Sequence, residues 1–292
     1  MSTYEFAVEE TFEPTAEEIL DIESLVKAKL LPLPGSATRV LGLIEDVNVS
    51  THDLAEVIAY DPVLASRVMR LANSPMYAMQ KEVATVQAAV AAVGVRSIYD
   101  IVMLGVAADS FSSDMRSMKT GVSIWEHSVA TAIAARALSK ELSLRGTEEA
   151  FTCGLLHDIG KNLLFQTDPM RYTETEVAEV EEAASKLEEQ IFGFNHSQVG
   201  FYVARRWGLG DAVAATILWH HKPKLATRAL AITHIVNVAD DLVTMKGMGL
   251  HMETPDSLPA SDSVAALELD SIKMENAWAA TEASLNEFLE SC

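Results

Sequence analysis

The sequence contains few cysteines. Its 292 residues include only Cys153 and Cys292, which are too few for a disulfide framework and fit a reducing compartment. It also lacks a run of about 18 uncharged apolar residues, the length that a membrane span requires. The first residues, Met1 to Phe6, lack the basic and apolar regions of a signal peptide. We therefore expect a cytoplasmic protein that does not enter a membrane.

Basic side chains are scarce beside acidic ones. The chain has 22 Lys and Arg against 42 Asp and Glu, which gives a formal net charge of -20. Nucleic-acid affinity depends on cations that neutralise phosphates, so we expect no binding to duplex nucleic acid. A small phosphorylated ligand stays compatible with this charge, because a metal and a few local cations are enough to hold it. The acidic stretches at residues 5–23 and Glu174 to Glu189 are expected to be solvated helix faces.

The sequence also lacks the apolar and polar alternation of strands, an internal repeat and any low-complexity stretch. Helix signals recur instead. Thr15 and Glu18 match a capping box before an amphipathic stretch, and Leu31-Pro-Leu-Pro-Gly35 ends that stretch. Asp61-Pro62 is typical of a helix start, and Gly94 is typical of a helix end. With 49% hydrophobic side chains to bury, the chain is predicted to have an all-helical fold.

These helices are predicted to form two packed lobes. A flexible tail is expected over residues 1–14 and an N-terminal helical lobe over residues 15–111. The polar segment at residues 112–121 is the predicted connector to a second lobe at residues 122–245. A loop and a closing helix follow at residues 246–292. Because the connector is short and both lobes are apolar, we expect the lobes to pack on each other.

A His-Asp pair stands inside an apolar run of the second lobe. His157 and Asp158 belong to Gly154-Leu-Leu-His-Asp-Ile-Gly-Lys161, within the run from Phe151 to Phe165. Burying an imidazole beside a carboxylate is unfavourable unless a side chain or a metal pairs with them. Gly160 is expected to let the backbone turn after the pair. The pair is therefore either a hydrogen-bonded core pair or part of a metal site.

Further histidines and a carboxylate favour the metal. We predict that helices over Ile124–Leu142 and Thr147–Leu156 run antiparallel, which brings His127 level with His157. Imidazole and carboxylate donors on a helical scaffold suit Fe, Mn, Zn or Ni. The predicted ligands of this divalent metal are His127, His157, Asp158, His196, His220, His221 and Asp240.

Helix ends suggest the charge of some of these imidazoles. Asn195 caps the helix that begins at His196, where a cation is disfavoured, so we expect a neutral His196 that is free to bind metal. The doublet His220-His221 precedes Pro223 at a helix end, where the dipole favours a charged imidazole. The doublet is therefore either a pair of ligands or a structural feature. Three other histidines match no motif and are expected at the surface or in satisfied core positions: His52, His234 and His251.

The same residues resemble a known family. The order of the predicted ligands is similar to that of the HD superfamily of metal-dependent phosphohydrolases, and His157-Asp-Ile-Gly-Lys161 resembles its HD-GYP branch. In the first lobe, Ile58 to Ser74 and Val86 to Gly94 resemble the HDOD domain, a bacterial signalling relative of the HD-GYP proteins. The resemblance covers about Leu31 to Asp241. It implies an HD-like helical bundle for the second lobe and a role in signal transduction.

The chain departs from the HD-GYP pattern at two places. Lys222-Pro-Lys-Leu-Ala-Thr227 replaces the Gly-Tyr-Pro loop, and Ser123 stands where a carboxylate is expected. In the active family these elements complete the metal cluster and shape the cyclic dinucleotide pocket. HDOD proteins in general resemble regulatory modules, so the retained ligands are compatible with a metal site that has no turnover.

Two functions follow from these observations. The one we favour is a bacterial regulatory module that binds a signalling protein or a small phosphorylated effector. The alternative is a metal-dependent phosphohydrolase or phosphodiesterase acting on a nucleotide or cyclic dinucleotide. In that alternative Asp158 belongs to the catalytic centre and Lys161 steadies the phosphate. The sequence carries no signal for an oligomeric state.

Overall fold

The computed structural model describes residues 15–30, 32–44, 46, 49–74, 83–111, 115, 118–144, 149–178, 181–250 and 261–291. Over these residues the chain is helical and has no strand, which confirms the predicted fold class. The expected tail at residues 1–14, most of residues 112–117 of the expected connector, His251 and Cys292 lie outside the described residues.

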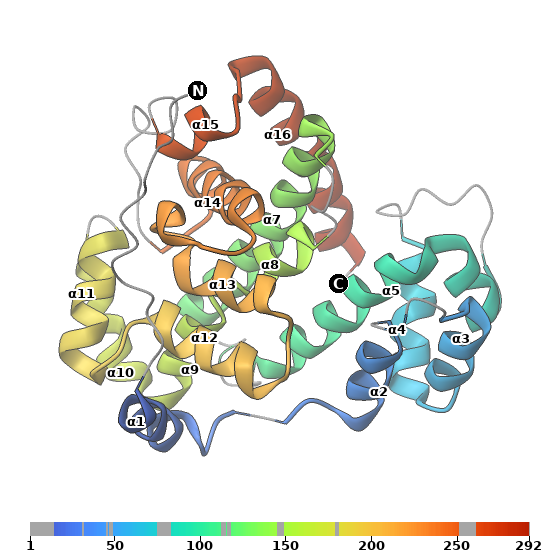
Figure 1. Cartoon of the computed structure of the whole chain (residues 1–292), viewed down its shortest axis with the longest axis horizontal. Helices are drawn as coiled ribbons and strands as arrows, with labels where there is room; N and C mark the ends of the chain where they lie inside the picture. The colour runs from blue at the N-terminus through green and yellow to red at the C-terminus, as the bar shows by residue number, and fades with distance from the viewer. Residues whose placement is uncertain are drawn as a thin grey trace.

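Figure 1 labels the helices in chain order. In chain order they are α1 (Ala16–Val26), α2 (Gly35–Ile44), α3 (Thr51–Ala59), α4 (Pro62–Ala72), α5 (Val86–Ser110), α7 (Lys119–Leu142), α8 (Ala150–Leu156), α9 (Ile159–Thr167), α10 (Pro169–Tyr172), α11 (Glu181–Phe192), α12 (His196–Arg206), α13 (Asp211–Trp219), α14 (Leu230–Met245), α15 (Asp262–Ala266) and α16 (Ser271–Ser291). Two short 3-10 segments are η2 (Thr173–Val177) and η3 (Pro223–Leu225).

Buried apolar side chains fall into two clusters. The smaller cluster joins α2, α3, α4 and residues of α5 as far as Val106, and the larger one joins α7, α8, α9, α12, α13, α14 and α16. Leu41, Leu71 and Trp207 pack against both clusters, so the two cores touch. The division into two packed lobes and the exact lobe boundaries stay predictions.

Helix α1 lies on the larger cluster. The backbone N–H of Glu18 donates to Thr15 Oγ1 at 3.2 Å and that of Thr15 donates to Glu18 Oε2 at 2.8 Å, so the expected capping box starts the helix. Its buried side chains, Ile22 and Val26, belong to the larger core, and α1 packs against α9 and α12. Within the predicted N-terminal lobe, α1 is thus the helix that packs on the larger cluster. Helix α1 ends at Val26, before Pro32 and Pro34, and Figure 1 shows α1 and α2 at separate places along the lower edge of the molecule.

Helix α5 links the two cores. Gly94 has a φ of 82°, a conformation that favours glycine, so it ends a first helical segment as expected. A second segment starts directly after it and continues to Ser110, and this segment reaches α8 in the larger core. By length and composition α5 is the one helix of the described residues that qualifies as a membrane span. Because it is kinked, carries Asp100 and packs against α2, α3 and α4, it is a core helix of the bundle.

Candidate metal centre

The structure brings all predicted metal ligands together. They form one group, called the metal cluster here, to which α7, the α8–α9 junction, α12, the end of α13 and α14 contribute. Every member except His221 is buried, and the His221 side chain is 25% exposed. The members are His127, His157, Asp158, His196, His220, His221 and Asp240.

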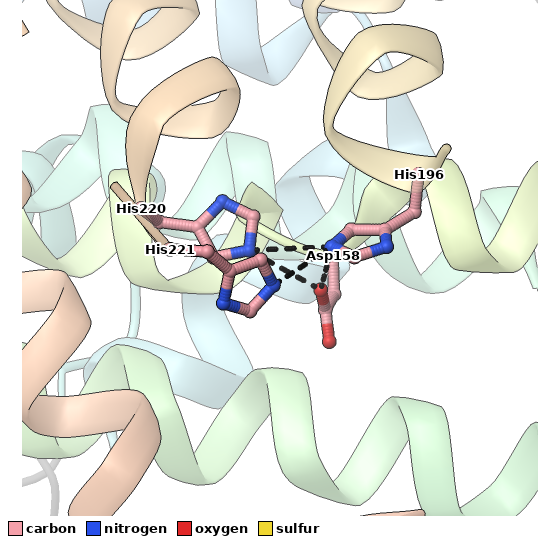
Figure 2. A group of neighbouring side chains, drawn as sticks. All are labelled: Asp158, His196, His220 and His221. Atoms are coloured by element: carbon pink, nitrogen blue, oxygen red, sulfur yellow. Dashed lines mark hydrogen bonds and ion pairs between the residues drawn. The ribbon is translucent and has the colours of Figure 1, made fainter. Parts of the chain in front are cut away.

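Asp158 lies at the centre of the metal cluster, and its two oxygens face different donors. Oδ1 lies 3.6 Å from Nε2 of His196 and 3.7 Å from Nε2 of His220, and Figure 2 shows this side. Oδ2 lies 3.3 Å from Nε2 of His157 and 3.7 Å from Nε2 of His127. His127 is also 3.0 Å from an oxygen of Asp240. The carboxylate of Asp158 is therefore shared between two groups of donors, each suited in composition to a divalent cation.

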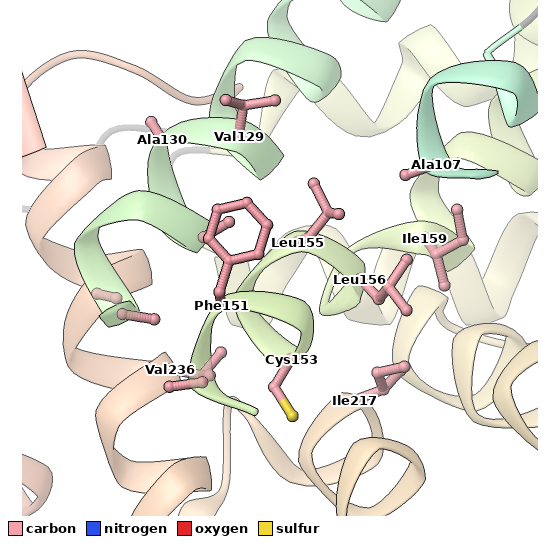
Figure 3. Close-up of a cluster of buried hydrophobic side chains, with 14 of the residues drawn as sticks. Ala107, Val129, Ala130, Phe151, Cys153, Leu155, Leu156, Ile159, Ile217 and Val236 are labelled. Atoms are coloured by element: carbon pink, nitrogen blue, oxygen red, sulfur yellow. The ribbon is translucent and has the colours of Figure 1, made fainter. Parts of the chain in front are cut away.

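The helix before the pair fixes where Asp158 stands. Helix α8 is surrounded by apolar side chains, and Figure 3 shows Phe151, Leu155 and Leu156 packed among residues of neighbouring helices. Cys153 is buried in the same helix, which accords with a structural thiol rather than a disulfide partner. The His-Asp pair follows at the end of α8, so the centre of the larger core delivers it to the cluster.

A hydrogen bond from Nδ1 orients four of the rings. In His127, His157 and His220 the acceptor is a backbone carbonyl, and in His196 it is the carboxylate of Glu188, each at 2.7 Å. Since a carbonyl oxygen only accepts, Nδ1 carries the proton in these rings, and Nε2 of the neutral ring keeps a lone pair. The carbonyls belong to Met248 for His127, Gly154 for His157 and Ile217 for His220.

These Nε2 atoms converge at short distances. Nε2 of His127 lies 3.3 Å from that of His157, and Nε2 of His196 lies 3.4 Å from that of His220 and 3.0 Å from that of His221. Asp158 Oδ1, buried beside them, has no hydrogen-bond partner within the described chain. Ring nitrogens packed this closely and an unpaired buried oxygen are both unfavourable without a cation between them. The donors therefore fit a divalent metal, as expected from the sequence.

The pKa of His196 is shifted in the direction opposite to that expected from the helix dipole. Burial lowers this pKa, but the carboxylates of Glu188 and Asp158 together outweigh burial and raise it above its ordinary value. The neutral form that the helix dipole alone predicts is therefore less favoured in the metal-free protein. Glu188 also accepts a hydrogen bond from the backbone N–H of His196 at 2.8 Å, so it holds both the ring and the start of α12.

The doublet also differs in its charge. Burial, followed by the neighbouring rings, holds the pKa of His220 well below its ordinary value and lowers the pKa of His221 to about 3. The helix dipole favours the charged form, but desolvation is the larger effect here. Because α13 ends at Trp219, both rings can face Asp158 from the turn that follows. Of the two alternatives for the doublet, the geometry favours ligands.

Glu188 was missed in the sequence. The acidic stretch that contains it was expected to be a solvated face, yet Glu188 is buried and also accepts from the hydroxyl of Tyr172 at 3.3 Å. Glu188 follows Ala184 by four positions, and the structure buries both on one face of α11.

Gly160 has a different role from the one expected. It does not have a positive φ, so no glycine-specific turn follows the His-Asp pair. A Cβ at Gly160 would lie 1.9 Å from the backbone oxygen of His196, so glycine is required for α9 and α12 to approach each other. This approach places Asp158 and His196 side by side.

Lys161 lies in the site but is held by Asp158. Its ammonium is 2.9 Å from Asp158 Oδ2, and the side chain is buried. Together with Asp240 and Ser123, which replaces the carboxylate of the HD-GYP pattern, it lines a cavity of about 20 Å³ beside the cluster. Such a cavity has room for about one water molecule. A nucleotide does not fit at this point without movement.

Two of the three unassigned histidines, His52 and His234, are described, and both lie apart from the cluster. His52 is exposed and lies beside Gln87, and His234 is buried with Nδ1 2.8 Å from the Ser263 hydroxyl. His234 is thus a satisfied core residue and a useful comparison for the ligands.

Comparisons with known proteins agree with this fold. The HDOD domain family matches residues 30–223, a range that includes every predicted ligand except Asp240. An uncharacterized protein of Treponema pallidum is 26% identical over 212 residues, which cover 68% of this chain and 40% of that protein. The chain therefore spans less than half the length of this curated relative.

Solved structures resemble most of the chain. The crystal structure of an HDOD domain protein of unknown function from Geobacter sulfurreducens has a TM-score of 0.68 and 25% identity, and the match covers 92% of this chain and 88% of that one. A provisionally named signal transduction protein from Marinobacter aquaeolei has a TM-score of 0.75 and 22% identity, with 93% of this chain and 64% of that one covered. At 22% identity, the similarity to the Marinobacter aquaeolei protein shows that the two chains share a fold.

Proposed function

Because the chain belongs to the HDOD family, we propose that it is a bacterial regulatory module, active in the cytoplasm, that binds divalent metal at the metal cluster. It acts by binding a signalling protein or a small phosphorylated effector. The metal, which is Fe, Mn, Zn or Ni on the chemistry of the donors, holds the cluster in a defined arrangement. The observation that supports the metal is the convergence of imidazole Nε2 atoms on the unpaired Oδ1 of Asp158.

The closed surroundings of the cluster support a regulatory role. Structural metal sites are closed, whereas catalytic sites keep an open position for substrate. Here the adjoining cavity is about 20 Å³ and Lys161 is paired with Asp158. Ser123, at the edge of this cavity, offers no carboxylate to the cluster.

The alternative is a phosphohydrolase, and one observation favours it. Asp158 presents separate oxygens to two groups of donors, as a carboxylate shared between two cations would. A pair of divalent cations supplies Lewis-acid activation of a phosphoester when bound. In this alternative the ammonium of Lys161 leaves Asp158 and neutralises a phosphate oxygen.

Metal content and activity measured on the same sample separate these functions. The protein is loaded anaerobically with iron or manganese, its metal is quantified, and turnover is followed with cyclic dinucleotides and simple phosphoesters. We expect bound metal without turnover. Asp158→Asn should lose the metal, and Asp100→Asn, which changes a buried carboxyl outside the cluster, should keep it.

Two results would contradict the proposal. Turnover that disappears in Asp158→Asn and persists in Asp100→Asn would establish the phosphohydrolase. Wild-type protein that stays free of metal after loading would remove the metal from both functions.

A further inference from the structure

A second cavity lies beside α12 and α13 and is not lined by any residue of the metal cluster. Its volume is about 660 Å³, within the range of about 300–1,000 Å³ that small-molecule sites occupy. The last two turns of α12, the length of α13 and the segment after η3 form most of its wall, and Ile19 of α1 completes it. The cavity is thus large enough for a ligand that the metal cluster excludes.

The charge of this cavity is opposite to that of the chain. Three guanidinium groups, those of Arg205, Arg206 and Arg228, line it beside one carboxylate, Asp211. In a chain with a net charge of -20, this local excess of arginine forms an anion-binding surface. Arginine is suited to this role because its planar fork of donors matches phosphate oxygens.

Asp211 arranges two of these arginines. Its Oδ1 accepts from Arg205 at 2.8 Å, and its Oδ2 accepts from Arg228. The three side chains are half or more exposed, at 57% for Arg205, 69% for Arg228 and 50% for Asp211. One carboxylate cannot neutralise two guanidinium groups, so positive charge remains available at the mouth of the cavity.

The rest of the wall is aromatic and apolar. Phe201, Tyr202, Leu218 and Trp219 line it together with the arginines. Phe201 and Trp219 are half-buried, so their rings are accessible from the cavity. Aromatic rings combined with arginine favour a ligand that has both a planar ring and an anionic group.

We propose that this cavity binds a mononucleotide, with the base against the aromatic wall and the phosphate at Arg205 and Arg228. This inference rests on the proposed regulatory function. It gives the small phosphorylated effector of that function a binding site and a chemical class. Trp219 of the cavity directly precedes His220 of the metal cluster. The two sites are therefore connected through the end of α13.

Calorimetric titration of the full chain with adenosine or guanosine monophosphate tests the proposal. The protein is first stripped of metal with a chelator, so that the result does not depend on the cluster. We expect saturable binding of one nucleotide per chain. Inorganic phosphate and the free nucleoside should each bind at least about tenfold more weakly, because each lacks half of the contacts.

Variants assign the binding to the cavity. Arg205→Gln and Arg228→Gln should each weaken nucleotide binding about tenfold through the loss of a charge-assisted contact. Both side chains are exposed, so neither substitution should unfold the protein. Asp211→Asn should tighten binding, since it removes the competing carboxylate. Arg96→Gln is the matched control, because Arg96 is equally exposed and does not line the cavity.

Three outcomes overturn the proposal: no saturable binding in the millimolar range, equal affinity for inorganic phosphate, or unchanged affinity in both arginine variants. Loss of binding in these variants while metal binding persists separates this site from the metal cluster. Failure of the titration together with a normal metal content would leave the proposed function standing without this site.

Discussion

Replacing His157 by Ala should abolish the stabilisation that a divalent metal gives. His157 is fully buried, its Nδ1 donates to Gly154, and its Nε2 faces both His127 and Asp158. Metal at about 100 times its dissociation constant stabilises the native state by about 2.7 kcal/mol. In a chain of this size that corresponds to a rise of about 5 °C in Tm. This rise in Tm is measured by thermal unfolding with and without iron or manganese, together with direct analysis of the bound metal.

The matched control is His234→Ala. His234 is also buried and hydrogen-bonded, to Ser263, but it stands outside the cluster. Both variants lose a buried imidazole and its hydrogen bond, so both should unfold at a lower temperature without metal. Only His157→Ala should lose the metal-dependent rise. A rise of equal size in wild type and His157→Ala would refute the assignment of His157 as a ligand.

Three further predictions concern residues that position or surround the cluster. Glu188→Gln removes the charge beside His196 and should weaken metal binding about 10- to 100-fold in a chelator competition; unchanged affinity would contradict its positioning role. Gly160→Ala should lower the unfolding free energy by about 3 kcal/mol, and the metal content with it, whereas Gly42→Ala has open space and should not. Burial raises the pKa of Asp100 in the folded protein to about 6. In the unfolded chain the same carboxyl ionises at a lower pH. The unfolding free energy should therefore fall as the pH rises from about 4 to 6. The Asn variant of Asp100 should lack this pH dependence and should be more stable than wild type by up to about 3 kcal/mol at pH 8, as measured by urea unfolding. The same pH dependence in Asp100→Asn and wild type would contradict this role of Asp100.

Much of the cluster was predictable because each ligand belongs to a local pattern. The His-Asp pair in an apolar run and the capped start of α12 are visible in short stretches of sequence, and the helical class follows from the missing strand alternation. The order of these patterns along the chain resembles the HD superfamily, so the ligands could be grouped before the distances between them were known.

The rest depended on contacts between distant segments. Glu188 is polar by composition and becomes part of the site only because α11 packs beside the start of α12. The role of Gly160 depends on how closely α9 approaches α12. The pKa shifts of His196 and His220 follow from burial and from neighbouring groups, which come together only in the fold.

The position of α1 changes how the smaller core is attached to the rest of the protein. Because α1 and the end of α5 both pack in the larger core, the chain leaves that core after α1 and returns to it through α5. The helices α2 to α4 therefore form an inserted loop of structure that is anchored at both ends, rather than a terminal domain on one tether. Two anchors oppose free rotation of α2 to α4 relative to the larger core. Trp207 lies where the two cores meet, so a partner that presses on α2 to α4 would act on the end of α12, the helix that begins with a metal ligand.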